Sequence, residues 1–228
     1  MNYDNIVKGI FIERKNRFIA DVIVNDKKEE VHVKNTGRCK EILREGAKIY
    51  LQKSDNPKRK TRYSLISAYK GDMLINVDSQ APNQVVFEGI KDGKIKDFKN
   101  LKILQKEKTF QKSRFDLYYE RKSGEKGFVE IKGVTLEKDN KTKFPDAPTT
   151  RGTKHVLEMI DAVEEGYEGN IFFLIQMDKV LEFTPNFDMD PDFSNALTKA
   201  KNNGVKIHIY NSIVHRKEIV INNKGFLL

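Results

Sequence analysis

Residues 113–135 read SRFDLYYERKSGEKGFVEIKGVT, and this stretch decides how the second half of the chain is interpreted. Its pattern predicts a β-hairpin with arms at Ser113–Arg121 and Lys126–Thr135, joined by a turn at Ser123-Gly124. Apolar side chains alternate with charged ones along the second arm, which is the pattern of a strand whose two faces differ.

The hairpin is expected to bring two acids and a lysine together. Glu130 and Lys132 point to the same face of the second arm, whereas Val129 and Ile131 point to the opposite face. Asp116 lies near the middle of the partner arm. We therefore expect Asp116, Glu130 and Lys132 to converge on one point.

These residue types in this arrangement indicate metal chemistry. Neighbouring carboxylates raise each other's pKa, and a divalent cation between them, with Mg²⁺ or Mn²⁺ suiting hard oxygen ligands, relieves the repulsion. Such an ion polarises a phosphodiester, and the lysine orients water or neutralises charge. The order is similar to the core of PD-(D/E)xK nuclease sites, with Asp116, Glu130 and Lys132 catalytic and the metal held by Asp116, Glu130 and the Ile131 carbonyl. The alternative is a solvated surface ion pair, which is common on strands.

Composition favours a nucleic-acid partner. The chain has 228 residues, a formal net charge of +9 and a pI of about 9.3, and most of the excess charge lies in residues 1–72. It has no apolar run long enough for a membrane helix and no signal peptide, which predicts a cytoplasmic protein with no membrane partner. The single cysteine, Cys39, excludes an internal disulfide and a cysteine zinc cluster.

The first 80 residues predict five or six short strands and one short helical piece at Lys40–Arg44, which is typical of an OB-like barrel. Such barrels bind nucleic acid through basic and aromatic side chains. The alternatives are that the phenylalanines belong to the core and that the basic loop Asn56–Arg62 is merely solvated. The candidate contacts are Phe11, Arg14, Arg17, Phe18, Asn35, Thr36, Arg38, Lys58, Arg59, Lys60 and Arg62.

Ser79–Asn83 indicates a boundary between an OB-like barrel at residues 1–82 and a second domain at 83–228. Asn83 is expected to cap a helix at Gln84–Ile90. Further on, Thr149 precedes a helix at Arg151–Gly166, and Asn170–Met177 reads as a strand buried on both faces. The second domain is therefore expected to be an α/β fold with a mixed sheet.

Four segments, VHVKNTGRCKEIL, SRFDLYYE, FVEIKGVTL and FPDAPTTRGTKHVLEM, resemble those of the sugar fermentation stimulation protein family in order and spacing. The resemblance implies an OB barrel followed by a restriction-endonuclease-like PD-(D/E)xK domain. It also implies a DNA-binding protein linked to the regulation of sugar metabolism, notably that of maltose.

The resemblance also implies functional residues. Asp116, Glu130 and Lys132 match the family's SRxD and E-x-K motifs, while Cys39 stands where the family often has methionine. Additional active-site positions implied by the resemblance or by nuclease folds in general are Glu88, Arg114, Asp146, Arg151 and His155.

Three hypotheses follow. The first is a DNA-binding protein with a Mg²⁺-dependent nuclease site, and the second is a non-catalytic DNA-binding regulator that uses the same basic surface. The third is a metabolic protein that binds a sugar phosphate at Thr149–Arg151. A helix-turn-helix is not evident, which argues against a repressor of that type.

Overall fold

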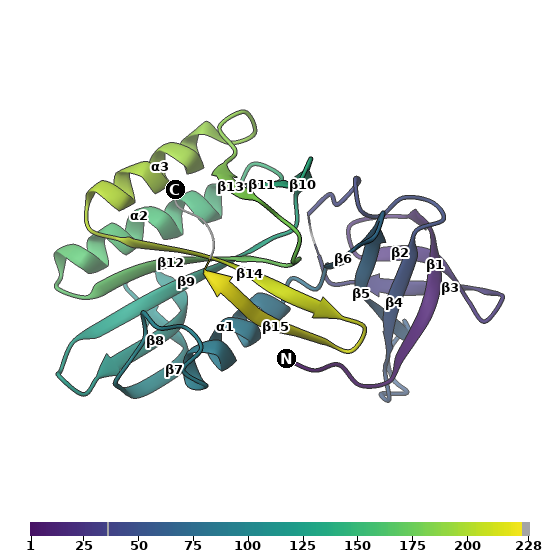
Figure 1. The fold of residues 1–228 in the computed structure, drawn as a ribbon, viewed down its shortest axis with the longest axis horizontal. Helices are drawn as coiled ribbons and strands as arrows, with labels where there is room; N and C mark the ends of the chain where they lie inside the picture. The colour runs from purple at the N-terminus through teal and green to yellow at the C-terminus, as the bar shows by residue number, and fades with distance from the viewer. Residues whose placement is uncertain (36, 225–228) are drawn as a thin grey trace.

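The computed structural model describes residues 1–35 and 37–224, and Figure 1 shows a barrel beside a larger α/β part. The barrel strands follow the order β3-β2-β1-β4-β5-β6, and pairing of β3 with β5 closes the barrel. This arrangement confirms the predicted OB-like fold. The strands are β1 (Ile6–Arg14), β2 (Ile19–Val24), β3 (Lys27–Val33), β4 (Lys48–Lys53), β5 (Tyr63–Lys70) and β6 (Met73–Asn76).

The barrel interior is built from alternate strand residues, which point inward. Val22, Val31 and Leu65 are each 0% exposed. Phe11, which the sequence offered as a nucleic-acid contact, is 2% exposed and belongs to this core. The expected helical piece at Lys40–Arg44 is instead a pair of turns, in which the amides of residues 42 and 43 both donate to the Cys39 carbonyl.

The α/β part is a mixed six-stranded sheet of order β15-β14-β12-β9-β8-β7. Strand β12 runs parallel to β9 and β14, and the remaining pairs are antiparallel. The mixed sheet was predicted, and the structure confirms it. Its elements are α1 (Ala81–Lys91), β7 (Leu101–Phe110), β8 (Ser113–Arg121), β9 (Lys126–Val134), α2 (Thr150–Glu164), β12 (Glu168–Ile175), α3 (Pro191–Asn202), β14 (Lys206–His215) and β15 (Glu218–Lys224).

Helices cover both faces of this sheet (Figure 1). Helices α2 and α3 pack in one apolar cluster with the sheet, and α1 packs in a second cluster on the opposite face. Residues 171–175 of β12 are therefore all 0% exposed, as the unbroken apolar run predicted. None of the helices in the described ranges is long and apolar enough to cross a membrane.

Two expectations about local structure were wrong. Helix α1 begins at Ala81 rather than at Gln84, because Pro82 fits its first turn, and Asn83 is consequently inside the helix rather than its cap. The predicted boundary after residue 82 falls in this first turn. The polar segment before α2 contributes β10 (Glu137–Lys138) and β11 (Lys141–Phe144) to a small sheet with β13 (Glu182–Pro185).

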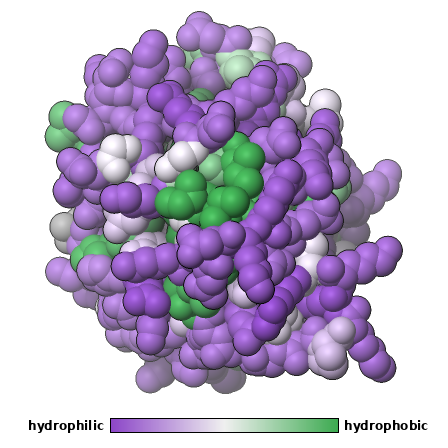
Figure 2. Space-filling view, turned by 90° about the vertical axis from the view of Figure 1, so that its right-hand side faces the viewer, coloured by the Kyte–Doolittle hydropathy of each residue, from purple (hydrophilic) through white to green (hydrophobic). Residues whose placement is uncertain are grey.

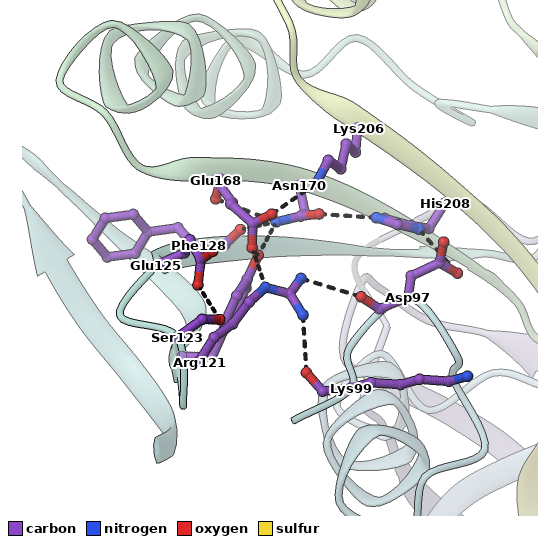
Figure 3. A network of polar contacts seen from close by, with 11 residues as sticks. Asp97, Lys99, Arg121, Ser123, Glu125, Phe128, Glu168, Asn170, Lys206 and His208 are labelled. Atoms are coloured by element: carbon purple, nitrogen blue, oxygen red, sulfur yellow. Dashed lines mark hydrogen bonds and ion pairs between the residues drawn. The ribbon is translucent and has the colours of Figure 1, made fainter. Parts of the chain in front are cut away.

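A polar network fixes the β8–β9 hairpin against the neighbouring strands (Figure 3). The Glu168 carboxylate accepts hydrogen bonds from Arg121 at 2.7 Å, Tyr119 at 2.7 Å and Lys206 at 2.8 Å. Partial burial opposes ionisation, but these donors lower the pKa of Glu168 to about 2. Asn170 of β12 donates to the Tyr119 hydroxyl at 3.0 Å and the Phe128 carbonyl at 3.0 Å. These contacts hold the end of the hairpin near its turn, where β8 and β9 are paired. The other end of the hairpin is therefore left to form a site.

Gln176 joins the barrel to the α/β part. It is 1% exposed, and its side-chain amide donates to the Asn76 carbonyl at 3.1 Å, the Asn76 side chain at 2.8 Å and the Asp78 carbonyl at 3.1 Å. The Asn76 amide in turn donates to the Gln176 carbonyl at 3.0 Å. This contact sets where the barrel lies relative to β12.

We predict that Gln176→Leu lowers the free energy of unfolding by about 2–4 kcal/mol, because it leaves buried acceptors without a donor. The measurement is the urea midpoint and slope, with Gln105→Leu on the exposed edge strand β7 as the matched control. The control should change the free energy by less than about 0.5 kcal/mol. Equal midpoints for the two variants would contradict this role.

Candidate functional site

Strands β8 and β9 stop pairing where the candidate acids begin. Their ladder runs from Glu120↔Lys126 to Leu117↔Val129 and goes no further. Beyond it the Asp116 carboxylate enters the gap, and its Oδ2 accepts a hydrogen bond from the Ile131 amide at 2.7 Å. A side chain of β8 therefore replaces a backbone partner of β9, which holds Asp116 beside Glu130.

Asn83 fixes the second oxygen of Asp116. Its Nδ2 donates to Asp116 Oδ1 at 2.7 Å, from the first turn of α1 on the other side of the gap. No local pattern predicts this contact, because it joins residues 33 positions apart. The early start of α1 is what places Asn83 there.

Glu130 is 4% exposed and has two partners on one oxygen. Its Oε1 lies 2.7 Å from Lys132 Nζ and 2.7 Å from His155 Nδ1. Its Oε2 is buried and has no hydrogen-bond partner among the described residues. A buried carboxylate oxygen normally has a partner, so this atom is available to a ligand.

The two acids have opposite electrostatics. Burial and the neighbouring Glu130 charge raise the pKa of Asp116 to about 6. For Glu130, burial works against the charge, but Lys132 and His155 outweigh it and lower the pKa. Glu130 is thus the stable anion of the pair, and its negative charge disfavours the ionised form of Asp116.

His155 reaches Glu130 from α2, whose N-terminus is capped by the Thr149 hydroxyl, which accepts from the Gly152 amide at 3.0 Å. On its other side, His155 Nε2 lies 3.5 Å from Arg151 Nε. Because the guanidinium can only donate, Nε2 accepts and Nδ1 carries the proton that is donated to Glu130. Arg151, His155 and Glu130 therefore form a chain from the exposed start of α2 to the buried acid.

The donor set fits a hard divalent cation. Asp116 and Glu130 supply carboxylate oxygens, one of them the unpartnered Oε2, and such oxygens are the ligands that Mg²⁺ and Ca²⁺ prefer. In the described ranges no group of three or more His, Cys, Asp or Glu side chains is placed to hold a metal. The set therefore suits an ion that keeps several waters, as Mg²⁺ does.

A groove of about 660 Å³ lies between the barrel and the segment that leads into α2. Arg17, Arg38 and Lys40 line it from the barrel, and Asp146 and Thr149 line it from the other side. Five residues of helix separate Thr150 from His155, a distance of roughly 7–8 Å. The groove thus reaches the start of the helix whose His155 contacts Glu130, although Asp116, Glu130 and Lys132 do not line it.

Comparison with known proteins identifies the family of the chain. Residues 80–218 match the family described as "Sugar fermentation stimulation protein RE domain", and residues 12–77 match "SfsA N-terminal OB domain". The chain belongs to the sugar fermentation stimulation protein family. The predicted resemblance is confirmed.

Relatives in this family match the whole length of the chain. A sugar fermentation stimulation protein homolog of Alkaliphilus oremlandii is 51% identical over 228 residues, which span 98% of this chain and 97% of that protein. A homolog of Clostridium botulinum (strain Langeland) is 52% identical over 219 residues, or 96% and 95% of the two chains. The solved structure of Pyrococcus furiosus SfsA in complex with Ca²⁺ has a TM-score of 0.91 at 26% identity and covers 100% of this chain and 98% of that one.

Several residues that the sequence suggested as additional active-site positions lie apart from the acid pair. The Glu88 carboxylate contacts the Met1 amine at 2.6 Å and Gln84 at 2.6 Å. Arg114 is exposed and pairs with Glu107 at 3.3 Å. Asp146 accepts from the Arg38 amide at 3.2 Å, in the groove. Of these additional positions, only His155 contacts Glu130.

Some of the suggested nucleic-acid contacts have structural partners instead. Arg14 donates to the carbonyls of Arg17, Asn35 and Gly37. The Asn35 side chain is buried and bonds Val77 and Gly37, and Arg59 donates to Ser64 at 3.0 Å. The side chains that remain exposed are Arg17, Phe18, Arg38, Lys58, Lys60 and Arg62. Thr36 lies outside the described residues.

We predict a pH signature for Asp116. Burial and the Glu130 charge raise the pKa of Asp116 in the folded state to about 6, above the ordinary value of 3.8 for an aspartate. The folded state therefore binds the extra proton, and the contribution to stability is lost as pH rises from about 4 to about 6. Asp116→Asn lacks this titration, and we expect it to be more stable than the wild type by about 1–3 kcal/mol at pH 7.5.

The measurement is urea unfolding of both proteins from pH 4 to pH 8 in the presence of a chelator. The difference in free energy should be small at pH 4 and grow towards pH 7, because all other titrating groups are common to both. A difference that does not vary with pH would refute the assignment.

Proposed function

We propose that this chain is a nucleic-acid-binding protein whose second domain hydrolyses phosphodiester bonds with a divalent cation, and that its substrate is DNA. Two observations on neighbouring acids carry the proposal. Glu130 has a buried oxygen without a hydrogen-bond partner among the described residues, and burial together with the Glu130 charge raises the pKa of Asp116. The Ca²⁺ in the solved structure of the Pyrococcus furiosus relative supports a divalent ion in this fold.

Asp116, Glu130 and the Ile131 carbonyl would hold the ion. When bound, Mg²⁺ or Mn²⁺ polarises a phosphate oxygen and lowers the pKa of a coordinated water. Asp116 contributes as an anion, which its pKa of about 6 allows at neutral pH. Asn83 and the Ile131 amide hold both of its oxygens in place at 2.7 Å.

Lys132 supplies the positive charge of the site. Its side chain is 14% exposed, and the ammonium lies 2.7 Å from Glu130 Oε1, so the charge is held at the acid pair with limited access to solvent. An ammonium fixed there stabilises negative charge developing on a phosphate, or orients the attacking water. His155 also bonds Oε1, which leaves Oε2 as the oxygen that would bind the ion.

The barrel side of the groove would hold the nucleic-acid backbone. Arg17, Arg38 and Lys40 line the groove, and Lys58, Lys60 and Arg62 are exposed on the β4–β5 loop. Contacts of this kind recognise phosphate and carry no sequence information. Binding should therefore weaken steeply with salt.

One feature favours a second candidate, a DNA-binding regulator of sugar metabolism without catalysis. Glu130 Oε1 is satisfied internally by Lys132 and His155, so the cluster is stable as an ion-paired network. In this case chelators would leave nucleic-acid binding unchanged and cleavage would be absent.

We predict that Glu130→Gln lowers Mn²⁺-dependent cleavage of DNA by at least about 100-fold, because it removes the stable anion of the site. The assay follows labelled single-stranded and duplex DNA with Mg²⁺, Mn²⁺ or a chelator. Glu125→Gln, at the exposed turn of the same hairpin, is the matched control and should cleave like the wild type. Equal cleavage by both variants, or none by the wild type on either substrate, would overturn the nuclease proposal.

We also predict that metal binding stabilises the fold through the same two acids. Saturating MnCl₂ should raise the free energy of unfolding of the wild type by about 1–3 kcal/mol, since an ion that binds only the folded state stabilises it. Asp116→Asn and Glu130→Gln should lose this gain, whereas Glu125→Gln should keep it. The readout is the shift in urea midpoint on adding MnCl₂, and an equal shift in all four proteins would exclude a site at these acids.

A further inference from the structure

The barrel carries a second hollow, on its outer face. This cavity of about 730 Å³ is lined by β1, β4 and β5 and by the turns at Gly46 and Gly71, and it shares no lining residue with the groove between the barrel and the segment that leads into α2. Figure 2 shows the side of the molecule on which the barrel lies, a hydrophilic face with an apolar patch near its centre. The cavity is therefore a separate surface feature.

Strand register places cations and apolar side chains alternately on this face. Lys8 pairs with Tyr50 and Ile10 pairs with Lys48 across β1 and β4. Because residues two apart point the same way, all four side chains are on the outer face. The two lysines are diagonal neighbours, about 7–8 Å apart. Ile10 is 40% exposed, so the surface formed by these four side chains is accessible to a ligand.

Two tyrosine rings form the wall of the cavity. The Tyr50 and Tyr69 rings are 6.1 Å apart between centroids, with an interplanar angle of 56°. Arg216, from the turn between β14 and β15, lies 5.9 Å from the Tyr50 ring centroid, and its Nη2 donates to the Ile6 carbonyl at 3.1 Å. The guanidinium anchors the ring position, because Arg216 is itself fixed to β1.

We propose that this face binds single-stranded nucleic acid, with a base against the Tyr50 ring and Ile10, and phosphates on Lys8 and Lys48. The inference rests on the proposed function only for the class of ligand and does not require catalysis. An aromatic surface flanked by lysines is what an unstacked base and its backbone recognise. Duplex DNA lacks exposed base faces, so it can use the lysines but not the ring.

The test is fluorescence anisotropy with a fluorescein-labelled 12-nucleotide thymidine strand, in chelator so that no cleavage occurs. Tyr50→Ala should weaken binding about 5- to 100-fold, and Tyr50→Phe, which keeps the ring, should restore it. Lys8→Ala/Lys48→Ala should reduce the slope of log affinity against log salt by about 1.4. Lys102→Ala/Lys122→Ala removes two exposed charges from the other domain and should bind like the wild type.

Binding of a duplex distinguishes base stacking on the tyrosine ring from general attraction to the lysines. A 12-base-pair duplex should bind wild type and Tyr50→Ala equally. Unchanged affinity for the thymidine strand in Tyr50→Ala, with an unchanged urea midpoint, overturns the proposal. So does an equal loss of single-strand and duplex binding, which would mean a general polyanion surface. Because cleavage is not measured, an inactive wild type leaves this result intact.

Discussion

The structure of the site depends on one carboxylate lying in a gap between two strands. Asp116 accepts the Ile131 amide where the β8–β9 ladder has ended, so the strands can diverge without leaving that amide unsatisfied. The Asp116 carboxylate therefore lies next to Glu130, at the point where the two strands stop pairing. Without Asp116, the Ile131 amide of β9 would lose its partner next to Glu130.

The same geometry lowers the stability of the folded state, because it holds two acids close together. The half-buried Asp116 carboxylate is held beside the buried Glu130 carboxylate, and one oxygen of Glu130 has no partner among the described residues. The surrounding structure supports this arrangement: β12 is buried on both faces, and the Glu168 network holds the paired end of the hairpin. An unfavourable electrostatic interaction that rigid neighbouring elements hold in place is typical of a binding or catalytic site.

The sequence predicted the local parts of this site and missed the long-range ones. Period-two alternation was enough to place Glu130 and Lys132 on one face, and the apolar run was enough to bury β12. The contacts of Asn83 with Asp116 and of Arg14 with the carbonyls of Asn35, Gly37 and Arg38 join segments that are distant in the sequence, and no periodicity encodes them. His155 came from family resemblance, because nothing local links α2 to β9.

The distribution of charge explains why the barrel and the acid pair belong together. An anionic site repels the phosphates on which it is proposed to act, so attraction has to come from elsewhere. Most of the chain's net charge of +9 lies in residues 1–72, and Arg17, Arg38 and Lys40 line the groove beside α2. The Arg38 amide bonds Asp146, and the Gln176 contacts fix β6 against β12. The cationic surface is thereby held in a fixed position relative to the acids, which is the arrangement that the proposed action on a polyanion requires.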